Sequence, residues 1–155
     1  MNEVQQPMFS IEKIYVKDLS LEVPGGPQTF MQQEQPQLEV QLAQQSQRVN
    51  DVVFEVTLVI TVTAKRAEKT LFLVEVSQAG VFQIRNVSEA DLAPVLGMVC
   101  PNVLFPYARE TVSDIVNRAG FPPVLLAPVN FEALYQQRLA EAVAQPGGSN
   151  IEATH

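Results

Sequence analysis

The sequence predicts an α+β fold: a four-stranded antiparallel sheet, meander-like, with helices packed on one face. Two observations support this class. Apolar and polar residues alternate through most of residues 9–84, which is the period of a sheet with one buried face. From residue 88 onward the apolar spacing becomes that of helices. Since strands precede helices and no block repeats, we expect one domain over residues 9–144, between flexible ends at 1–8 and 145–155.

Four stretches have the strand period. They cover residues 9–23, 38–42, 52–63 and 70–84. Pro24 ends the first strand, residues 44–50 form a polar connection, and residues 64–69 form a charged turn. Because the strands follow one another without an intervening helix, each is predicted to pair with the next as a meander.

Two helices are predicted after the sheet. Ser88 caps a short one that ends by Pro101, and a longer one covers residues 103–118. Pro106 is compatible with the longer helix only in its first turn, and Gly120 suits its C-terminal end. The longer helix carries an apolar stripe made of Leu104, Ala108, Val112, Ile115, Val116 and Ala119.

The segment 120–130 is uncharged and contains three prolines, so it is predicted to be irregular. Asn130 then caps a last helix over residues 131–144.

Charge limits the classes of partner. The chain has a net charge of −7, which repels phosphate backbones and makes nucleic acid an unsuitable partner, whereas a basic protein or a cationic unfolded chain suits it. Solubility alone could also explain the negative charge. Only 17% of residues are charged, below the roughly 25% of globular proteins, which hints that sister subunits cover part of the surface.

The residues that catalysis and metal binding need are scarce. His155 is the last residue and Cys100 is the single cysteine, so neither a nucleophile–base pair nor a zinc cluster is expected. Gly25 and Gly26 precede a proline rather than a helix, unlike a phosphate-binding loop. We therefore expect no enzymatic activity, cofactor or metal; a pair of carboxylates is the one catalytic arrangement left open.

Targeting segments are also not evident. The N-terminus has no basic residue before an apolar run, and no stretch approaches the roughly 18 apolar residues of a membrane span. These features predict a soluble, intracellular protein without membrane insertion.

Some side chains on the strands fit a partner surface better than a core. Leu71, Leu73 and Glu75 share the face opposite Phe72 on the fourth strand, and Asp18 and Glu22 share one face of the first. A leucine beside carboxylates on an open sheet face could bind a partner. Alternatively, the leucines pack under a loop or in a subunit contact, and the carboxylates are merely solvated.

Two loops are rich in apolar side chains. Their residues are Phe30, Met31, Phe121, Val124, Leu125, Leu126 and Val129. They either cap the core or line an apolar groove that can adapt to varied ligands.

Several stretches resemble the SecB family of protein-export chaperones. They are IYVKDLSLEVP (14–24), FEVTLVITVTA (54–64), LFLVEVSQAGVF (71–82), CPNVLFPYARE (100–110) and LAPVNFEALY (126–135). The resemblance covers residues 9–143, and its last two motifs are the most specific. It implies a homotetramer built as a dimer of dimers, in the cytoplasm, that binds unfolded precursor proteins without ATP and passes them to the motor SecA.

The resemblance also implies roles for particular residues. The family's SecA-binding residues fall on Asp18, Glu22, Leu73 and Glu75, and its client-binding groove falls on the two apolar loops. The tail, with Glu152 as its one acid, is less acidic than the family pattern, so a tail contribution to SecA binding is in doubt. An intracellular carrier or regulator that binds a small ligand in the same groove remains the alternative.

Overall fold

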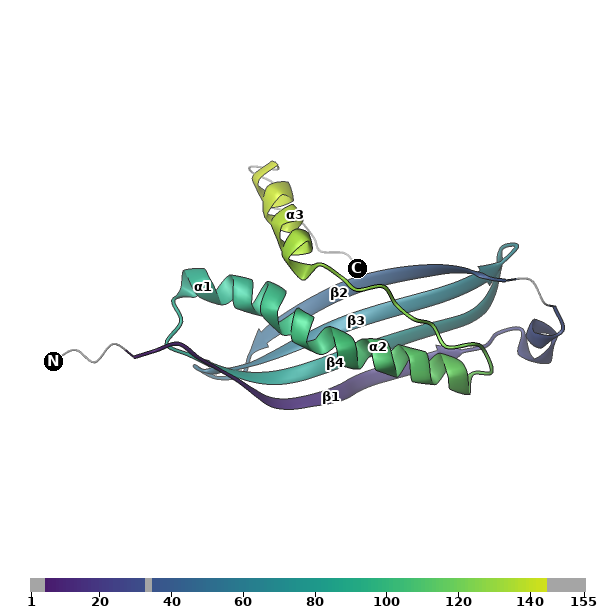
Figure 1. Cartoon of the computed structure of the whole chain (residues 1–155), viewed down its shortest axis with the longest axis horizontal. Helices are drawn as coiled ribbons and strands as arrows, with labels where there is room; N and C mark the ends of the chain where they lie inside the picture. The colour runs from purple at the N-terminus through teal and green to yellow at the C-terminus, as the bar shows by residue number, and fades with distance from the viewer. Residues whose placement is uncertain (1–4, 33–34, 145–155) are drawn as a thin grey trace.

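The computed structural model describes residues 5–32 and 35–144, which form a single sheet with helices beside it (Figure 1). The expected N-terminal tail lies partly outside the described residues and the C-terminal tail wholly outside. The strands are β1 (Met8–Glu22), β2 (Gln37–Arg48), β3 (Val53–Arg66) and β4 (Lys69–Arg85). The helical elements are the 3₁₀ turn η1 (Gly26–Phe30), α1 (Glu89–Pro94), the π-helical segment η2 (Val95–Val99), α2 (Cys100–Arg118) and α3 (Phe131–Ala144).

The sheet is antiparallel, as predicted, but the predicted meander is wrong. The strand order is β1-β4-β3-β2, so β1 pairs with β4 and the segment after β1 crosses to the far edge, as in a Greek key. Burial explains the order. Every fully buried side chain of the sheet lies in β3 or β4, whereas β1 and β2 hold none. The two most apolar strands therefore occupy the centre, and the two most polar strands form the edges.

Helix α2 lies on one face of the sheet, over β3 and β4 (Figure 1). Its predicted stripe is confirmed, because Leu104, Ala108, Val112 and Val116 are fully buried against the strands. A glycine in β4 allows this close approach. A Cβ at Gly80 would lie 2.9 Å from Leu104 Cδ2 and 2.7 Å from the Phe82 ring, closer than real contacts.

The first predicted helix does not stop before the second. Instead α1 leads through η2 into α2 as one rod (Figure 1). Pro101 explains the π-helical segment, because a proline has no N–H to donate to the carbonyl of Gly97 four residues earlier. The Cys100 N–H bonds to the carbonyl of Val95, five residues back, and the Gln44 side chain of β2 donates to the Gly97 carbonyl at 3.1 Å.

Pro106 differs from the prediction as well. Because α2 begins at Cys100, this proline lies inside the helix rather than in its first turn. Asn102, whose carbonyl loses its partner, and Pro106 are both exposed, so water can satisfy that carbonyl.

The predicted helix caps at Ser88 and Asn130 and the predicted helix stop at Gly120 are confirmed. Ser88 accepts a hydrogen bond from the Asp91 N–H, and Asn130 accepts one from the Ala133 N–H at 3.0 Å. Gly120 follows α2 with a φ of +95°. Beyond the irregular segment 121–130, α3 projects away from the sheet (Figure 1), so it does not pack on the sheet as α2 does.

Two strand boundaries were predicted too short. β2 continues to Arg48 through residues predicted to be a connection, and only Ala67 and Glu68 separate β3 from β4. In both places the backbone ladder continues although the side chains are polar.

Candidate functional site

Four predicted residues come together on the sheet face that α2 leaves uncovered, here termed the open face. Glu22 pairs with Leu73, and Ser20, between Glu22 and Asp18, pairs with Glu75. The three carboxylates are exposed and Leu73 is half-buried. Thr61 Oγ1 of β3 donates to Glu75 Oε2 at 3.3 Å. Asp18, Glu22, Leu73 and Glu75 thus form one acidic patch with an apolar side chain in it.

Leu71, which alternation along the strand placed on the same face as Leu73, does not belong to this patch, so the alternative of a packed leucine holds for it. The register between β3 and β4 shifts at Ala64 and Lys65, which is a β-bulge. Leu71 is only 5% exposed and belongs to the hydrophobic core. Strict alternation along the strand could not reveal this, since the bulge interrupts it.

A polar cluster lies on the open face as well, and sequence reasoning missed it. Glu55 of β3 accepts hydrogen bonds from the Tyr15 hydroxyl and from Lys17 Nζ of β1, the latter at 2.6 Å. The Lys17 ammonium and the Tyr15 hydroxyl lower the pKa of the Glu55 carboxyl. The same hydrogen bond, with burial and the carboxylate charge, raises the pKa of Tyr15. The cluster connects β1 to β3 across β4.

A bulge in β1 makes this arrangement possible. The pairing of β1 with β4 shifts between Val16 and Asp18, so Lys17 is the extra residue. Tyr15 and Asp18 can therefore share the open face, although strict alternation would place them on opposite faces.

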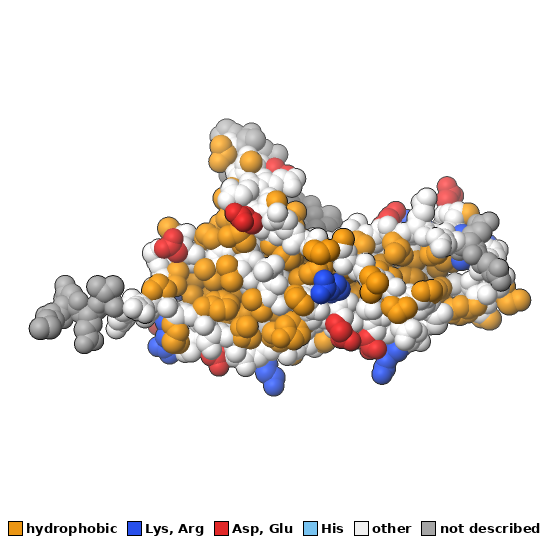
Figure 2. Space-filling view, in the orientation of Figure 1, with side chains coloured by type: hydrophobic (Ala, Val, Ile, Leu, Met, Phe, Trp, Pro, Cys, Tyr) orange, Lys and Arg blue, Asp and Glu red, His pale blue; other side chains and the backbone are white. Residues whose placement is uncertain are grey.

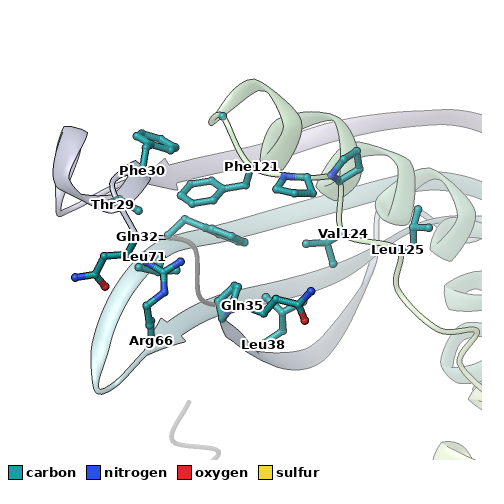
Figure 3. Close-up of a pocket in the computed structure, with 15 residues that line it drawn as sticks. Thr29, Phe30, Gln32, Gln35, Leu38, Arg66, Leu71, Phe121, Val124 and Leu125 are labelled. Carbon is teal, nitrogen blue, oxygen red and sulfur yellow. The ribbon is translucent and has the colours of Figure 1, made fainter.

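An apolar groove of about 600 Å³ lies on the other side of the sheet, where the two apolar loops meet (Figure 3). Phe121 is its centre, since its ring lies 5.1 Å from that of Phe30 and 4.8 Å from that of Phe72. Val124 and Leu125 continue the wall, and Leu125 is 85% exposed.

The predicted groove residues divide into two groups. Phe30, Phe121, Val124 and Leu125 line the groove. The others do not: Met31 is 80% exposed beside it, Leu126 packs partly against the core, and Val129 lines a separate cavity with Phe131.

Other lining residues were not predicted. They include Leu38, Arg66, Leu71 and Phe72. Leu38 and Phe72 were assigned to strands, and only tertiary packing brings strand ends next to these loops.

The face that carries α2 also exposes apolar side chains beyond the groove. Figure 2 shows them as a band along the molecule. Phe9, Ile11, Val16 and Leu19 of β1 are each 40–46% exposed, and Tyr107 of α2 is 51% exposed. A band of this kind is typical of surfaces that other protein chains cover.

The described part of the chain holds no group of three or more His, Cys, Asp or Glu residues placed to bind a metal. Burial raises the pKa of the Cys100 thiol to about 12, so this cysteine is packed rather than reactive. Among the helices within residues 5–32 and 35–144, none has the length and hydropathy to cross a membrane.

The sequence is similar to those of known proteins over nearly its whole length. A protein of Chromobacterium violaceum named protein-export protein SecB is 66% identical over 143 residues, which are 91% of this chain and 95% of that protein. The protein of the same name from Dechloromonas aromatica is 58% identical over 152 residues, covering 98% of this chain and all of that one.

The fold has a solved counterpart. A SecB-like chaperone of Mycobacterium tuberculosis, in complex with a ChAD peptide from an antitoxin, superposes with a TM-score of 0.63 at 17% identity, covering 78% of this chain and 90% of that one. The family model described as preprotein translocase subunit SecB matches residues 2–142. With that match and relatives of such identity over nearly their whole length, the chain belongs to the SecB family.

Proposed function

We propose that this member of the SecB family, a chaperone of protein export, holds unfolded precursor proteins in the apolar groove and delivers them to SecA through the acidic patch. One observation carries the proposal: the two surfaces lie on opposite sides of one sheet. A client and SecA can therefore be bound at the same time, which delivery requires.

The groove suits segments of unfolded chain. Its aromatic and aliphatic walls bury apolar side chains without requiring one particular shape. Each subsite that buries some 100 Å² of apolar area contributes about 2–3 kcal/mol before the cost of ordering the client chain. Tight binding therefore needs several linked contacts, which a long unfolded chain supplies and a folded domain does not. The Mycobacterium tuberculosis neighbour, with its peptide, indicates that this fold can hold a peptide.

A homotetramer, arranged as a dimer of dimers, would link several grooves. Two features support this assembly. β1 is an edge strand whose outer side pairs with no other strand in the described part of the chain, and the face beside it carries the exposed apolar band. Pairing of two β1 edges would build the dimer, and the α2 faces of two dimers would cover each other's bands.

The acidic patch suits a basic surface of SecA in the cytoplasm. Exposed carboxylates accelerate association with a basic partner, and salt weakens this attraction because the screening length is about 8 Å at physiological ionic strength. Leu73, in the patch, would add burial that salt does not weaken.

The Glu75→Lys variant tests the separation of the two surfaces. Glu75 is exposed, so we expect the variant to keep its fold and its affinity for an unfolded precursor while its affinity for SecA falls about ten-fold or more. Two titrations measure this, one with SecA and one with the precursor. Glu141→Lys, an equal charge reversal on exposed α3, is the matched control. If both affinities of Glu75→Lys fall together, or neither falls, the patch is misassigned.

The groove volume of about 600 Å³ also fits a small apolar ligand, which supports a carrier as the second candidate. Suppression of aggregation separates the two functions. A chaperone should protect several unrelated unfolded proteins at near-stoichiometric ratios. A carrier should protect none and should saturate with one ligand.

A further inference from the structure

An ion pair lies on the open face next to the acidic patch. Lys17 Nζ is 2.6 Å from Glu55 Oε1, and Lys17 directly precedes Asp18 of the patch. Neighbouring Cα atoms along a chain are about 3.8 Å apart, so a cation lies beside one end of the patch. Since like charges repel, an uncompensated ammonium in this place would oppose the binding of a basic partner.

The carboxylates of the patch are not compensated in this way. Within residues 5–32 and 35–144, Asp18, Glu22 and Glu75 form no ion pair, whereas Glu55 pairs with Lys17. The hydrogen bond that Glu75 accepts comes from a neutral hydroxyl. The charges of the patch therefore remain available to a partner, while the charge of the neighbouring cation is neutralised inside the chain.

The register of the sheet determines the direction in which Lys17 reaches. Across β4, Glu55 of β3 is level with Lys13 of β1, four residues before Lys17. Glu75 is level with Ser20, three residues after Lys17. The ion pair therefore holds the ammonium toward the start of β1 and away from Glu75.

Tyr15 holds the Glu55 carboxylate in this position. Its hydroxyl donates to Glu55 Oε2, which leaves Oε1 for the ammonium of Lys17. Both hydrogen bonds favour the ionised form and lower the pKa of Glu55, so the carboxylate stays charged at neutral pH. The Lys17 side chain is 48% exposed, so without Glu55 the ammonium would be free to reach other carboxylates of the open face.

We propose that Glu55 sets the strength with which the acidic patch attracts a basic partner, although Glu55 itself lies outside the patch. By neutralising Lys17 and holding it toward the start of β1, Glu55 leaves the Asp18 carboxylate uncompensated. Without Glu55, the ammonium of Lys17 would compensate Asp18 and repel the cations of the partner. The inference rests on the proposed function, because it assumes that the patch binds a basic surface of SecA.

Removal of the two charges, singly and together, tests this role. The affinity of the full-length protein for SecA is measured by isothermal titration calorimetry at low and at physiological salt. Glu55→Gln should bind SecA about three-fold more weakly at low salt, and salt should reduce the loss because it screens exposed charges. The double variant Glu55→Gln with Lys17→Gln should regain the affinity of the unsubstituted protein, since both charges of the pair are then absent.

This regain separates a charge effect from damage to the fold. A second substitution in the same cluster cannot rebuild the hydrogen bonds that Glu55→Gln removes, so a purely structural role predicts no regain. Lys17→Gln alone gives an independent test that leaves Glu55 in place. It adds an unpaired carboxylate to the open face and should bind SecA about two-fold more tightly at low salt.

Lys13 provides the matched control. It is an exposed cation on the same face of β1, but it lies five residues from Asp18. Glu55→Gln with Lys13→Gln removes the same charges as the other double variant, yet it should regain far less of the affinity, because attraction and repulsion weaken with distance. Equal regain in the two double variants would overturn the inference, since the effect would then depend on net charge alone.

Two other outcomes would overturn it as well. One is an unchanged affinity of Glu55→Gln for SecA at low salt, and the other is weaker binding by Lys17→Gln alone, which would mean that Lys17 itself contacts SecA. Failure of the proposed function looks different, because Asp18→Asn and Glu75→Lys would then bind SecA as tightly as the unsubstituted protein. If those two variants bind weakly and Glu55→Gln does not, the patch is correct and only the role of Glu55 is wrong.

Discussion

At the scale of single residues, Glu55 joins strands that are not neighbours. Its carboxylate accepts hydrogen bonds from Tyr15 and Lys17 on β1, across the intervening β4. The Glu55 side chain is 17% exposed and Lys17 is 48% exposed, so solvent screens part of the ion pair. Hydrogen bonds to a charged group that is mostly shielded still contribute about 1–2 kcal/mol. We infer that Glu55 fixes β1, the strand with an open edge, onto the sheet.

We expect Glu55→Gln to lower the free energy of unfolding by about 1–2 kcal/mol at neutral pH. The pKa of Glu55 is lower in the folded chain than its ordinary value of 4.5, so its contribution is complete above that value and is lost as pH falls through the folded pKa. The deficit of the variant should therefore shrink in acid. Urea unfolding at pH 7 and in steps below pH 4.5, at one fixed protein concentration, measures it.

Glu75→Gln is the control for that experiment. Glu75 is exposed and accepts one hydrogen bond, from Thr61. Its replacement should change the free energy of unfolding by no more than about 0.5 kcal/mol, both at pH 7 and at each acidic pH. A Glu55→Gln deficit that stays constant as pH falls would show that the carboxylate charge contributes nothing.

At the scale of elements, the β3–β4 turn is unusual. Its two central residues, Ala67 and Glu68, have φ angles of 48° and 69°. Both angles are positive, as in the type I′ turns of two-residue hairpins, which strongly prefer Asn-Gly. Residues with a Cβ cost about 1 kcal/mol or more each in this conformation. The ladder on both sides thus holds the turn in a conformation that its own residues disfavour.

Replacing both central residues, Ala67→Asn with Glu68→Gly, should therefore stabilise the protein by about 1 kcal/mol, after the entropy that glycine adds to the unfolded chain. The matched control is Ala67→Val, which should destabilise it, because a β-branched residue at positive φ is strained further. Chemical unfolding of the three proteins measures the differences. An Asn-Gly variant less stable than the original would refute this account of the turn.

The helices and strands also show which features of the fold can be predicted from the sequence alone. Local patterns predicted each strand and each helix cap, because periodicity and capping depend on neighbours along the chain. The order of the strands in the sheet could not be predicted in this way, because it depends on which whole strands are the most apolar, and local patterns do not compare one strand with another. The unbroken rod from α1 to α2 was missed because a proline was taken as a helix end, whereas the π-helical segment and Gln44 accommodate it.

The candidate sites were predictable to different degrees. The acidic patch forms because β1 and β4 are neighbours in the sheet, which brings together Asp18, Glu22, Leu73 and Glu75. Alternation along each strand predicts which face a residue occupies but not which strands are neighbours. The loop side of the groove was partly predictable, since apolar loop residues such as Phe121 are conspicuous in sequence. Leu71 and Arg66 were not, because the bulge at Lys65 and the packing of β4 against two loops arise only in the folded chain.

At the scale of the whole molecule, the sheet separates two kinds of surface. The open face is polar and carries the acidic patch, whereas the face beside α2 carries the groove and the exposed apolar band (Figure 2). An exposed apolar band on a single chain in water favours association with other protein chains. If sister subunits cover the band and leave the open face free, assembly and partner binding use different faces and do not compete.

The last prediction tests this division of faces. We expect light scattering to give a tetramer mass at micromolar concentration, because closed symmetric association covers the β1 edge and the apolar band together. Leu19, 41% exposed, pairs with Val76 on the band side of β1, and the exposed Ser20 beside it points to the open face. Leu19→Lys places a charge in the proposed contact and should lower the mass, whereas Ser20→Lys, the same charge one residue away, should leave it unchanged. Circular dichroism checks that both variants keep their secondary structure. A monomer mass for the unsubstituted protein, or equal effects of the two substitutions, would contradict the assignment, because the contact would then not depend on which face of β1 carries the charge.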